Sequence, residues 1–447
     1  MDEESRFTHI IKTIGILVSI VAVIALGIYL SATQAPSYKG KTIIRWVVDP
    51  NPIRKETIAL FESKNSGIHV INDPDAGAQR LLTQVAGGVS PDVMALYSTE
   101  SVRMFARNDI LLDLKPYIKK YNIPFDELYP QLSPYMYYKD KIVGVTENCS
   151  TISVYYNKKM FDKAGLPYPK PGWTWDDCVE LGKKLTLYKT IGDRKVVVQK
   201  GLCVTDLMSP CFTWMYGGRM FSPDGKKCVL DSPEAKKGWR FWADLRLKYH
   251  ITPSASEAQS MAPTGGWGGD YLLFAQGKVA MMFIGRFLIP EYRKQTDLEW
   301  GAVDLPRGPN PMNMFFSKTY SIPKTCKNKD AAIKFVRHIL SKENQMLIAN
   351  FGDGFPVRRN KEITKGFLYN PQYPKETNNQ FYIDSIKNAR VPETSQYINS
   401  SDLDAIVARE LGFMWIEKQT PDQTCDNIAK QVNAIIKRNI ANPNFLD

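Results

Sequence analysis

Apolar and polar residues alternate along the first third of the chain in a way that predicts strands separated by helices. Short β-branched runs at Thr42–Asp49, Gly67–Asp73 and Pro91–Tyr97 predict buried strands. Apolar residues at three- and four-residue spacing predict helices at Ile53–Lys64 and Gln79–Ala86. This alternation is typical of an α/β fold with a parallel sheet. Such sheets bind their ligands at the carboxyl ends of the strands.

One extended run is too long for a single sheet. Ile142–Asn157 is strand-like throughout but changes character at Glu147–Ser150. Because strands rarely exceed about ten residues, we expect this run to cross between two lobes. Strand-like residues return at Thr319–Lys324, and helical spacing is found at Trp175–Leu187, Glu234–Lys248, Lys329–Leu340, Asp402–Trp415 and Asp422–Lys437.

The N-terminal segment predicts contact with a membrane. Thr13–Leu30 carries no charged side chain, and as a helix these 18 residues would span about 27 Å, close to the thickness of a bilayer core. The alternative is a signal peptide cleaved near residues 32–35, which would release the protein to the periplasm. Pro36 directly follows the best cleavage position, and no cysteine precedes Cys149 for lipid attachment. We therefore expect a single-pass anchor and linker over residues 1–40, with the remaining chain outside the cytoplasm.

Composition narrows the possible functions. The 447-residue chain has 58 Lys and Arg against 46 Asp and Glu, a net charge of +12. Because acidic residues are interspersed with the basic ones, we expect no nucleic-acid partner. Four scattered histidines and seven cysteines without a C-x-x-C pair lack the spacing of a metal site. We expect neither a metal nor another cofactor.

Several phrases, in order, match those of a known family. GGVSPDVMAL at Gly87–Leu96 is similar to a family strand entry, and VYYNKKMFDKAGLPYPKPGWTWDDCVELGKKLT at Val154–Thr186 is similar to its most specific block. WMYGGRMFSPDGKKCVLDSPEA, FAQGKVAMMFIGRF and SIPKTCKNKDAAIKFVRHILSKENQ follow at residues 214–235, 274–287 and 321–345. The chain resembles the extracellular solute-binding proteins of ABC importers, in the oligosaccharide group that includes maltose-binding proteins.

The resemblance implies a fold and partners. The fold would be two α/β lobes of the periplasmic-binding-protein type, class II, with a ligand cleft between them, added to the N-terminal membrane helix. The strands would cross between the lobes near Asn148–Ser150 and Pro309–Phe316. The implied function is capture of a carbohydrate, expected to be an oligosaccharide, and its delivery by a monomer to the membrane permease subunits of an ABC transporter. Lobe I would comprise residues 41–148 with about 317–360, and lobe II residues 149–316 with about 361–447.

A sugar presents apolar C–H faces and a rim of hydroxyl groups, so its site needs aromatic platforms and charged or amide partners. Residues of these types fall at predicted strand ends, at the crossing or in turn-rich loops. Trp46 and Trp214 are also typical of a core, whereas the glycines beside Trp267 favour ligand contact. The guanidinium of Arg286 suits a carboxylate, so the ligand is expected to be neutral or mildly acidic. The predicted ligand-binding residues are Trp46, Asp49, Tyr97, Ser98, Asn148, Ser150, Trp214, Trp267, Arg286, Phe287 and Phe355.

Two other functions are compatible with the sequence. Asp49, Glu147 and Asp270 could supply the paired carboxylates of a glycan-processing enzyme. No catalytic motif surrounds any of them, so we expect no catalytic residue and no enzyme activity. A membrane-tethered sensing or partner-binding domain of the same fold stays open, because its sequence would look the same as that of a transport protein.

Overall fold

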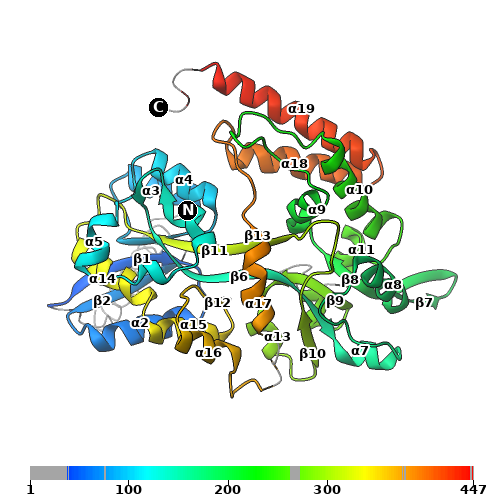
Figure 1. The fold of residues 1–447 in the computed structure, drawn as a ribbon, viewed down its shortest axis with the longest axis horizontal. Helices are drawn as coiled ribbons and strands as arrows, with labels where there is room; N and C mark the ends of the chain where they lie inside the picture. The colour runs from blue at the N-terminus through cyan, green and yellow to red at the C-terminus, as the bar shows by residue number, and fades with distance from the viewer. Residues whose placement is uncertain are drawn as a thin grey trace, which may run out of the picture.

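The computed structural model describes residues 38, 40–74, 77–261, 272–374, 376, 379–442 and 445. Two α/β lobes lie side by side along the long axis of the molecule, and strands run through both (Figure 1). The expected membrane segment, residues 13–30, lies outside the described residues. Within the described ranges, no helix is both long and apolar enough to cross a bilayer.

Lobe I contains the parallel sheet that the sequence predicts. β1 (Thr42–Val48) pairs in parallel with β2 (Ile68–Pro74) and with β3 (Val93–Leu96). The predicted strands and helices between residues 42 and 97 are confirmed, each boundary within two residues. The other elements of this lobe are α2 (Ile53–Lys64), α3 (Ala78–Ala86), α4 (Thr99–Arg107), α5 (Lys115–Lys120), α6 (Ser133–Met136), β4 (Tyr137–Tyr138), β5 (Lys141–Ile142), α14 (Lys329–Ile339) and α15 (Lys342–Phe351).

One long strand connects the lobes. The first half of β6 (Val145–Asn157) pairs with antiparallel β11 (Asn313–Ser321), and the second half pairs with β9 (Val279–Gly285) and β10 (Trp300–Val303). β11 in turn pairs with β3, so one sheet passes from lobe I into lobe II with the order β2-β1-β3-β11-β6-β9-β8-β7. The long extended run expected in this region is confirmed.

A third segment also passes the junction, and the sequence analysis did not predict it. α17 (Gln380–Ser385) lies against β6, where the Ser385 hydroxyl donates to Thr151 Oγ1 over 2.7 Å. β13 (Ala389–Arg390) then pairs with β11 at Asn313 and Met314. The chain continues from there to the C-terminal helices of lobe II (Figure 1).

Lobe II is built from helices around the far end of the sheet. β8 (Arg194–Val204) pairs in parallel with β9 and forms a hairpin with β7 (Leu187–Ile191). All five residues of β7 are exposed, so this strand lacks the apolar alternation that would have predicted it. The helices are α7 (Lys158–Lys163), α8 (Trp175–Leu185), α9 (Ser209–Met215), α10 (Pro233–Leu247), α11 (Ala255–Met261), α12 (Leu272–Ala275), α13 (Ile289–Arg293), α18 (Ser400–Trp415) and α19 (Pro421–Ile440).

α8 shows how local sequence fixes these helices. The Asp177 N–H donates to Thr174 Oγ1 over 3.2 Å, while the Thr174 N–H donates to the Asp177 carboxylate over 2.8 Å. This reciprocal cap satisfies two free N–H groups at the helix start. The helix then packs closely on β8, because a Cβ atom at Gly201 would lie only 2.0 Å from the Gly182 carbonyl oxygen.

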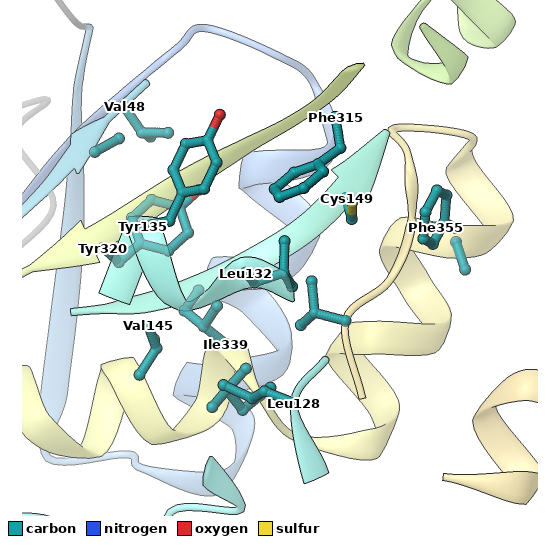
Figure 2. Close-up of a cluster of buried hydrophobic side chains, with 14 of the residues drawn as sticks. Val48, Leu128, Leu132, Tyr135, Val145, Cys149, Phe315, Tyr320, Ile339 and Phe355 are labelled. Atoms are coloured by element: carbon teal, nitrogen blue, oxygen red, sulfur yellow. The ribbon is translucent and has the colours of Figure 1, made fainter. Parts of the chain in front are cut away.

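The largest core runs from lobe I through the junction into lobe II, where it includes Phe274 of α12 and Tyr292 of α13. Figure 2 shows Val48 of β1, Val145 of β6 and both Phe315 and Tyr320 of β11 within one cluster of buried side chains. Phe355 belongs to the same cluster and lies in β12 (Phe355–Pro356), which pairs with β6. The junction is therefore a packed region in which the crossing strands share a core with lobe I.

The segment after residue 360 packs at the junction of the lobes. α16 (Lys361–Leu368) contacts α15 and β12, and Phe367 is buried in the core that extends from lobe I. The predicted division, with about residues 361–447 in lobe II, stays a prediction. Residues 394–400, which follow β13, instead approach lobe II, where Tyr397 and Ile398 are buried in the core around α9, α10 and α19.

Candidate functional site

The ends of two parallel strands place a carboxylate and an aromatic ring together. Asp49 follows β1 and Tyr97 follows β3. The Asp49 N–H donates to Tyr97 Oη over 2.8 Å, and the Tyr97 hydroxyl donates to Asp49 Oδ2 over 3.2 Å. Both remain accessible, since Tyr97 is 42% exposed and the Asp49 side chain is 29% exposed. This is the strand edge at which the sequence predicts a ligand.

A buried network of charges lies behind Asp49. Arg54, on the first turn of α2, contacts Glu147 Oε2 over 2.9 Å, Asp353 Oδ2 over 2.9 Å and Asp49 Oδ2 over 3.2 Å. Lys318 Nζ of β11 lies 3.1 Å from Asp353 Oδ2, 3.3 Å from Asp49 Oδ2 and 3.4 Å from Glu147 Oε2. Two cations and three carboxylates therefore join β1, α2, both crossing strands and the loop before β12.

The network fixes the ionisation of its members. Burial by itself would raise the pKa of the Asp49 and Asp353 carboxyl groups, but the Lys318 ammonium and the Arg54 guanidinium outweigh it and hold both pKa values below the usual range. Burial likewise opposes the charge of Arg54, yet the surrounding carboxylates, Glu147 foremost, raise its pKa. Asp49 is thus an ionised carboxylate in a fixed position at the accessible edge of the network.

Asn148 and Ser150 lie on β6 at the crossing, as predicted, and both are engaged in hydrogen bonds. The Asn148 side-chain amide donates to the Asp353 carbonyl, and the Asn148 carbonyl accepts from the Ser317 hydroxyl over 2.7 Å. Ser150 Oγ accepts from the Arg286 N–H over 2.6 Å. These side chains tie the crossing strand to its neighbours.

Arg286 has a structural position rather than the expected carboxylate-binding one. Its guanidinium is buried beside the rings of Phe367 and Tyr382, and it donates to the Gly354 carbonyl over 2.7 Å. Glu376 already supplies a carboxylate oxygen at 3.4 Å. Burial lowers the pKa of Arg286, despite the opposing effect of nearby Tyr382 and Glu376.

Phe287, the next residue, is partly exposed. Its ring meets that of Phe316 on β11 edge to face, with 5.9 Å between the ring centres. Both rings are only partly buried and lie beside the polar stretch of β6. They form an aromatic surface at the junction that is separate from Tyr97 at the lobe I edge.

Three other predicted ligand residues are buried in this structure, and a fourth, Ser98, caps a helix. Trp46 and Phe355 are fully buried, the former against Tyr320 and Phe335. Trp214 is buried in lobe II and donates to Glu393 Oε1 over 2.9 Å. Ser98 caps α4 by accepting from the Ser101 N–H over 3.0 Å. Apolar strands and helix starts use these residue types for packing and capping, which the sequence alone did not separate from ligand contact.

Two further expectations concern residues outside the described ranges. Trp267 and Asp270 lie outside the described residues, so the structure places neither. Of the other two carboxylates considered for catalysis, Glu147 is fully buried and forms an ion pair with Arg54, whereas Asp49 is accessible. Among the described residues, no group of His, Cys, Asp or Glu side chains has the arrangement of a metal site.

The network contains residues that the sequence analysis missed. Arg54, Lys318 and Asp353 were not predicted, and neither was Phe316. One signal was present, because Lys318 is a lone cation within the otherwise uncharged strand NMFFSKTYS. A charged residue in the middle of a buried strand requires a partner, and that requirement indicates a polar site nearby.

Contacts between the lobes border the site near α4, which begins just after Tyr97. The Ser400 N–H donates to Glu100 Oε1 over 2.8 Å, and Arg107 Nη1 donates to the Gln396 carbonyl over 3.1 Å. Arg103 hydrogen bonds to Thr394 Oγ1. Burial raises the pKa of Glu100. α4 of lobe I is therefore joined to the 394–400 segment of lobe II.

Comparison with known proteins identifies the family. Residues 48–346 match the sequence model of the bacterial extracellular solute-binding proteins. The chain belongs to this family. The resemblance noted from the sequence is confirmed, and the established members of the family are binding proteins.

Individual relatives of this solute-binding protein support the family assignment and the fold. A candidate binding protein from Brucella abortus is 25% identical over 411 residues, which cover 89% of this chain and 93% of the relative. An ABC substrate-binding protein from Listeria monocytogenes, solved with cycloalternan, is similar in fold with a TM-score of 0.77 and 23% identity over 89% of this chain and 99% of that one. A maltose-bound protein from T. maritima gives a TM-score of 0.68 and 21% identity over 88% of this chain and 100% of the other. The two-lobed solute-binding fold is therefore shown.

Proposed function

We propose that this solute-binding protein captures a carbohydrate between its lobes and delivers it, without chemical change, to the permease of an ABC importer. The observation that carries the proposal is the pairing of accessible aromatic rings with a fixed carboxylate. Tyr97 and Asp49 provide both at the lobe I edge, and Phe287 and Phe316 add a second aromatic surface at the junction. Sugars require this combination of a flat apolar face and charged hydrogen-bond acceptors.

The hydrogen-bonding groups favour a ligand rich in hydroxyl groups. Asp49 is ionised and can only accept hydrogen bonds, so a ligand must present donors to it, and the hydroxyl groups of a sugar are such donors. Arg286 is enclosed by Gly354, Phe367 and Tyr382, which removes the reason for expecting an acidic sugar. We therefore propose a neutral saccharide. Cycloalternan and maltose, named for the Listeria and T. maritima proteins, belong to this class.

We also propose that the chain is tethered to the membrane by residues 13–30, with the lobes outside the cytoplasm. The uncharged stretch is long enough to span a bilayer, and an extracytoplasmic position is where members of the family meet their solutes. A tether would hold the loaded protein close to the permease and raise its effective concentration there.

A thermal-shift screen tests the carbohydrate assignment. The panel contains neutral mono- and oligosaccharides, amino acids, polyamines and metal ions. A saccharide that binds the folded state should raise the melting temperature with a dependence on ligand concentration, and a coupled chromatographic assay should recover that saccharide unchanged. Stabilisation by amino acids, polyamines or metal ions alone would contradict the proposal, and so would recovery of a cleaved sugar.

A further inference from the structure

A basic groove lies on lobe I beside the point at which the chain enters the fold. It consists of two adjoining cavities of about 560 Å³ and 530 Å³ that share Lys64, Asn65 and Lys334. The end of α2, the turn before β2, the turn before α14, α14 itself and the start of α15 supply most of the lining. Thr42, the first residue of β1, lines the second cavity and donates its N–H to the Gly67 carbonyl over 2.9 Å.

The groove has more cations than its acidic residues neutralise. Lys64 Nζ pairs with Glu343 over 2.6 Å, and Lys334 Nζ pairs with Asp330 over 2.7 Å. The lining residues Lys327, Lys329 and Arg337 are exposed, and none of them takes part in an ion pair with another described residue. The groove therefore offers three unneutralised cations on one surface, which suits a multivalent anionic partner.

The chain length between the anchor and the fold indicates which partner is near. Leu30 ends the uncharged stretch, and Tyr38 already stacks on His69 of β2 with 3.7 Å between the ring centres, so seven residues separate the stretch from the fold. Seven residues reach at most about 25 Å even when fully extended. The face around Thr42 is thus the part of the fold that the proposed tether holds nearest to the bilayer.

We propose that this basic groove docks on anionic phospholipid headgroups and holds lobe I against the membrane. The inference rests on the tether given under Proposed function and not on the identity of the solute. Lysine and arginine side chains form charge-assisted hydrogen bonds with phosphate oxygens, and attraction to an anionic surface acts over about one Debye length. The short linker keeps the groove about this close to the membrane surface. Docking therefore adds an electrostatic contact to the attachment that the tether provides.

Energy transfer in nanodiscs tests the inference. The full chain, with Ser66→Cys carrying a donor dye beside the groove, is reconstituted into nanodiscs that contain acceptor-labelled lipid and no other membrane protein. The seven natural cysteines are buried, so the introduced thiol is labelled selectively. Transfer should be higher in discs of phosphatidylglycerol and phosphatidylcholine than in discs of phosphatidylcholine alone, and should fall to the neutral-lipid level in high salt. Equal transfer in the two lipids overturns the inference.

A charge-reversal variant and its matched control locate the contact. The triple substitution Lys327→Glu, Lys329→Glu and Arg337→Glu should abolish the difference between the two lipids. The control, Lys163→Glu, Lys184→Glu and Lys226→Glu, changes the net charge equally at exposed positions of lobe II and should keep the full difference. An equal loss in both variants would show a general charge effect and overturn the groove assignment. Melting curves of both variants verify that they are folded.

Further measurements distinguish a failure of lipid docking from a failure of the tether or of saccharide binding. A donor at Thr190→Cys on β7 should show less transfer than the donor at Ser66→Cys. Greater transfer from Thr190→Cys would mean that lobe II faces the bilayer, and the inference would be wrong. A chain that elutes apart from the nanodiscs would overturn the tether together with the inference. Saccharide binding is measured on the same samples by thermal shift, so its failure is seen independently.

Discussion

Arg54 shows how strongly a single side chain can depend on its partners. Its guanidinium is fully buried, and three carboxylates from distant parts of the chain surround it. Charges buried in this way are tolerated only when they are paired, because each loses its hydration. The side chain therefore connects the edge of lobe I with β6 and the loop before β12.

Removing that side chain should destabilise the protein. We expect Arg54→Ala to lower the free energy of unfolding by roughly 3–5 kcal/mol, because Glu147 and Asp353 would lose a buried counter-charge. Urea unfolding followed by circular dichroism measures the change. Arg359→Ala is the control, since Arg359 is exposed and donates to backbone carbonyls such as that of Asp126 over 2.7 Å. An unfolding midpoint of Arg54→Ala equal to that of the control would contradict the prediction.

His338 should make stability depend on pH. Its ring is buried with Nε2 3.1 Å from the Thr57 carbonyl, and burial lowers its pKa from 6.5 to about 4, with the Lys64 charge adding to the effect and Glu343 opposing it. Between these values the unfolded chain binds more protons, so stability should fall by roughly 3 kcal/mol as the pH decreases from 6.5 to 4. Denaturant curves at several pH values measure this fall. A His338→Gln variant should lose most of the slope, and an unchanged slope would assign it to other groups.

Substitutions of two aromatic residues at the junction should affect different quantities, one the affinity for saccharide and the other the folding stability. Phe287→Ala should weaken saccharide binding by more than about 1 kcal/mol, because loss of a stacking surface is local. Phe355→Ala, at a fully buried position, should instead cost roughly 3–5 kcal/mol of folding stability. Titration calorimetry and melting curves measure the two effects. If Phe287→Ala lowered the melting temperature as much as Phe355→Ala, Phe287 would be a core residue.

For single residues, the sequence predicted where a side chain lies in the fold better than it predicted what that side chain contacts. Asp49, Tyr97, Asn148 and Ser150 do lie at the strand edge or crossing, because strand ends can be located from apolar runs. Arg286 illustrates the difficulty, since its environment is created by Phe367, Tyr382 and Glu376, which are far away in sequence. No local pattern reports such distant contacts.

Helices and strands were largely predictable because most of them bury one face. α2 begins and ends where the apolar spacing predicts. The capping box of α8 consists of Thr174 and Asp177, whose residue types and spacing are typical of a helix start. The exceptions have physical reasons. β7 buries none of its residues, and β13 contains only two, so neither leaves a pattern of apolar positions.

The packing of α8 on β8 predicts opposite effects for two glycine substitutions. Gly201→Ala should destabilise the protein, because the added Cβ would lie 2.0 Å from the Gly182 carbonyl oxygen and the helix would have to move. Gly412→Ala should stabilise it by about 0.5–1 kcal/mol, since Gly412 is within α18 and a Cβ atom there meets nothing within 4 Å. Thermal unfolding of both variants is the measurement. A rise in melting temperature for Gly201→Ala would contradict the close packing.

For the whole molecule, the sequence predicted the two-lobed class through its family resemblance, and the structure shows three segments at the junction. Two of these, β6 and β11, are long strands, and the third passes through β13. A junction of this kind permits rotation of one lobe relative to the other while the lobes stay folded.

Ligand binding should close the lobes, and the contacts of α4 should contribute. A ligand that touches both lobes favours the state in which both sets of contacts exist. We expect a smaller radius of gyration in small-angle scattering when saccharide is added. Arg107→Ala, which removes the hydrogen bond to the Gln396 carbonyl, should enlarge the radius of the free protein and weaken binding, whereas Arg359→Ala should do neither. An unchanged radius at saturating ligand would argue against closure.

All seven cysteines are buried and none is in a disulfide bond, which matters for how such a chain matures outside the cytoplasm. Burial raises the pKa of the Cys228 and Cys326 thiols to about 12, so in the folded protein these two groups are almost never thiolates. The unfolded chain has no such protection, and an oxidising compartment would join its thiols in pairs that the native fold does not contain. During export, folding of the chain therefore competes with oxidation of its thiols. Recombinant yield should be highest where the chain folds before an oxidase acts on it.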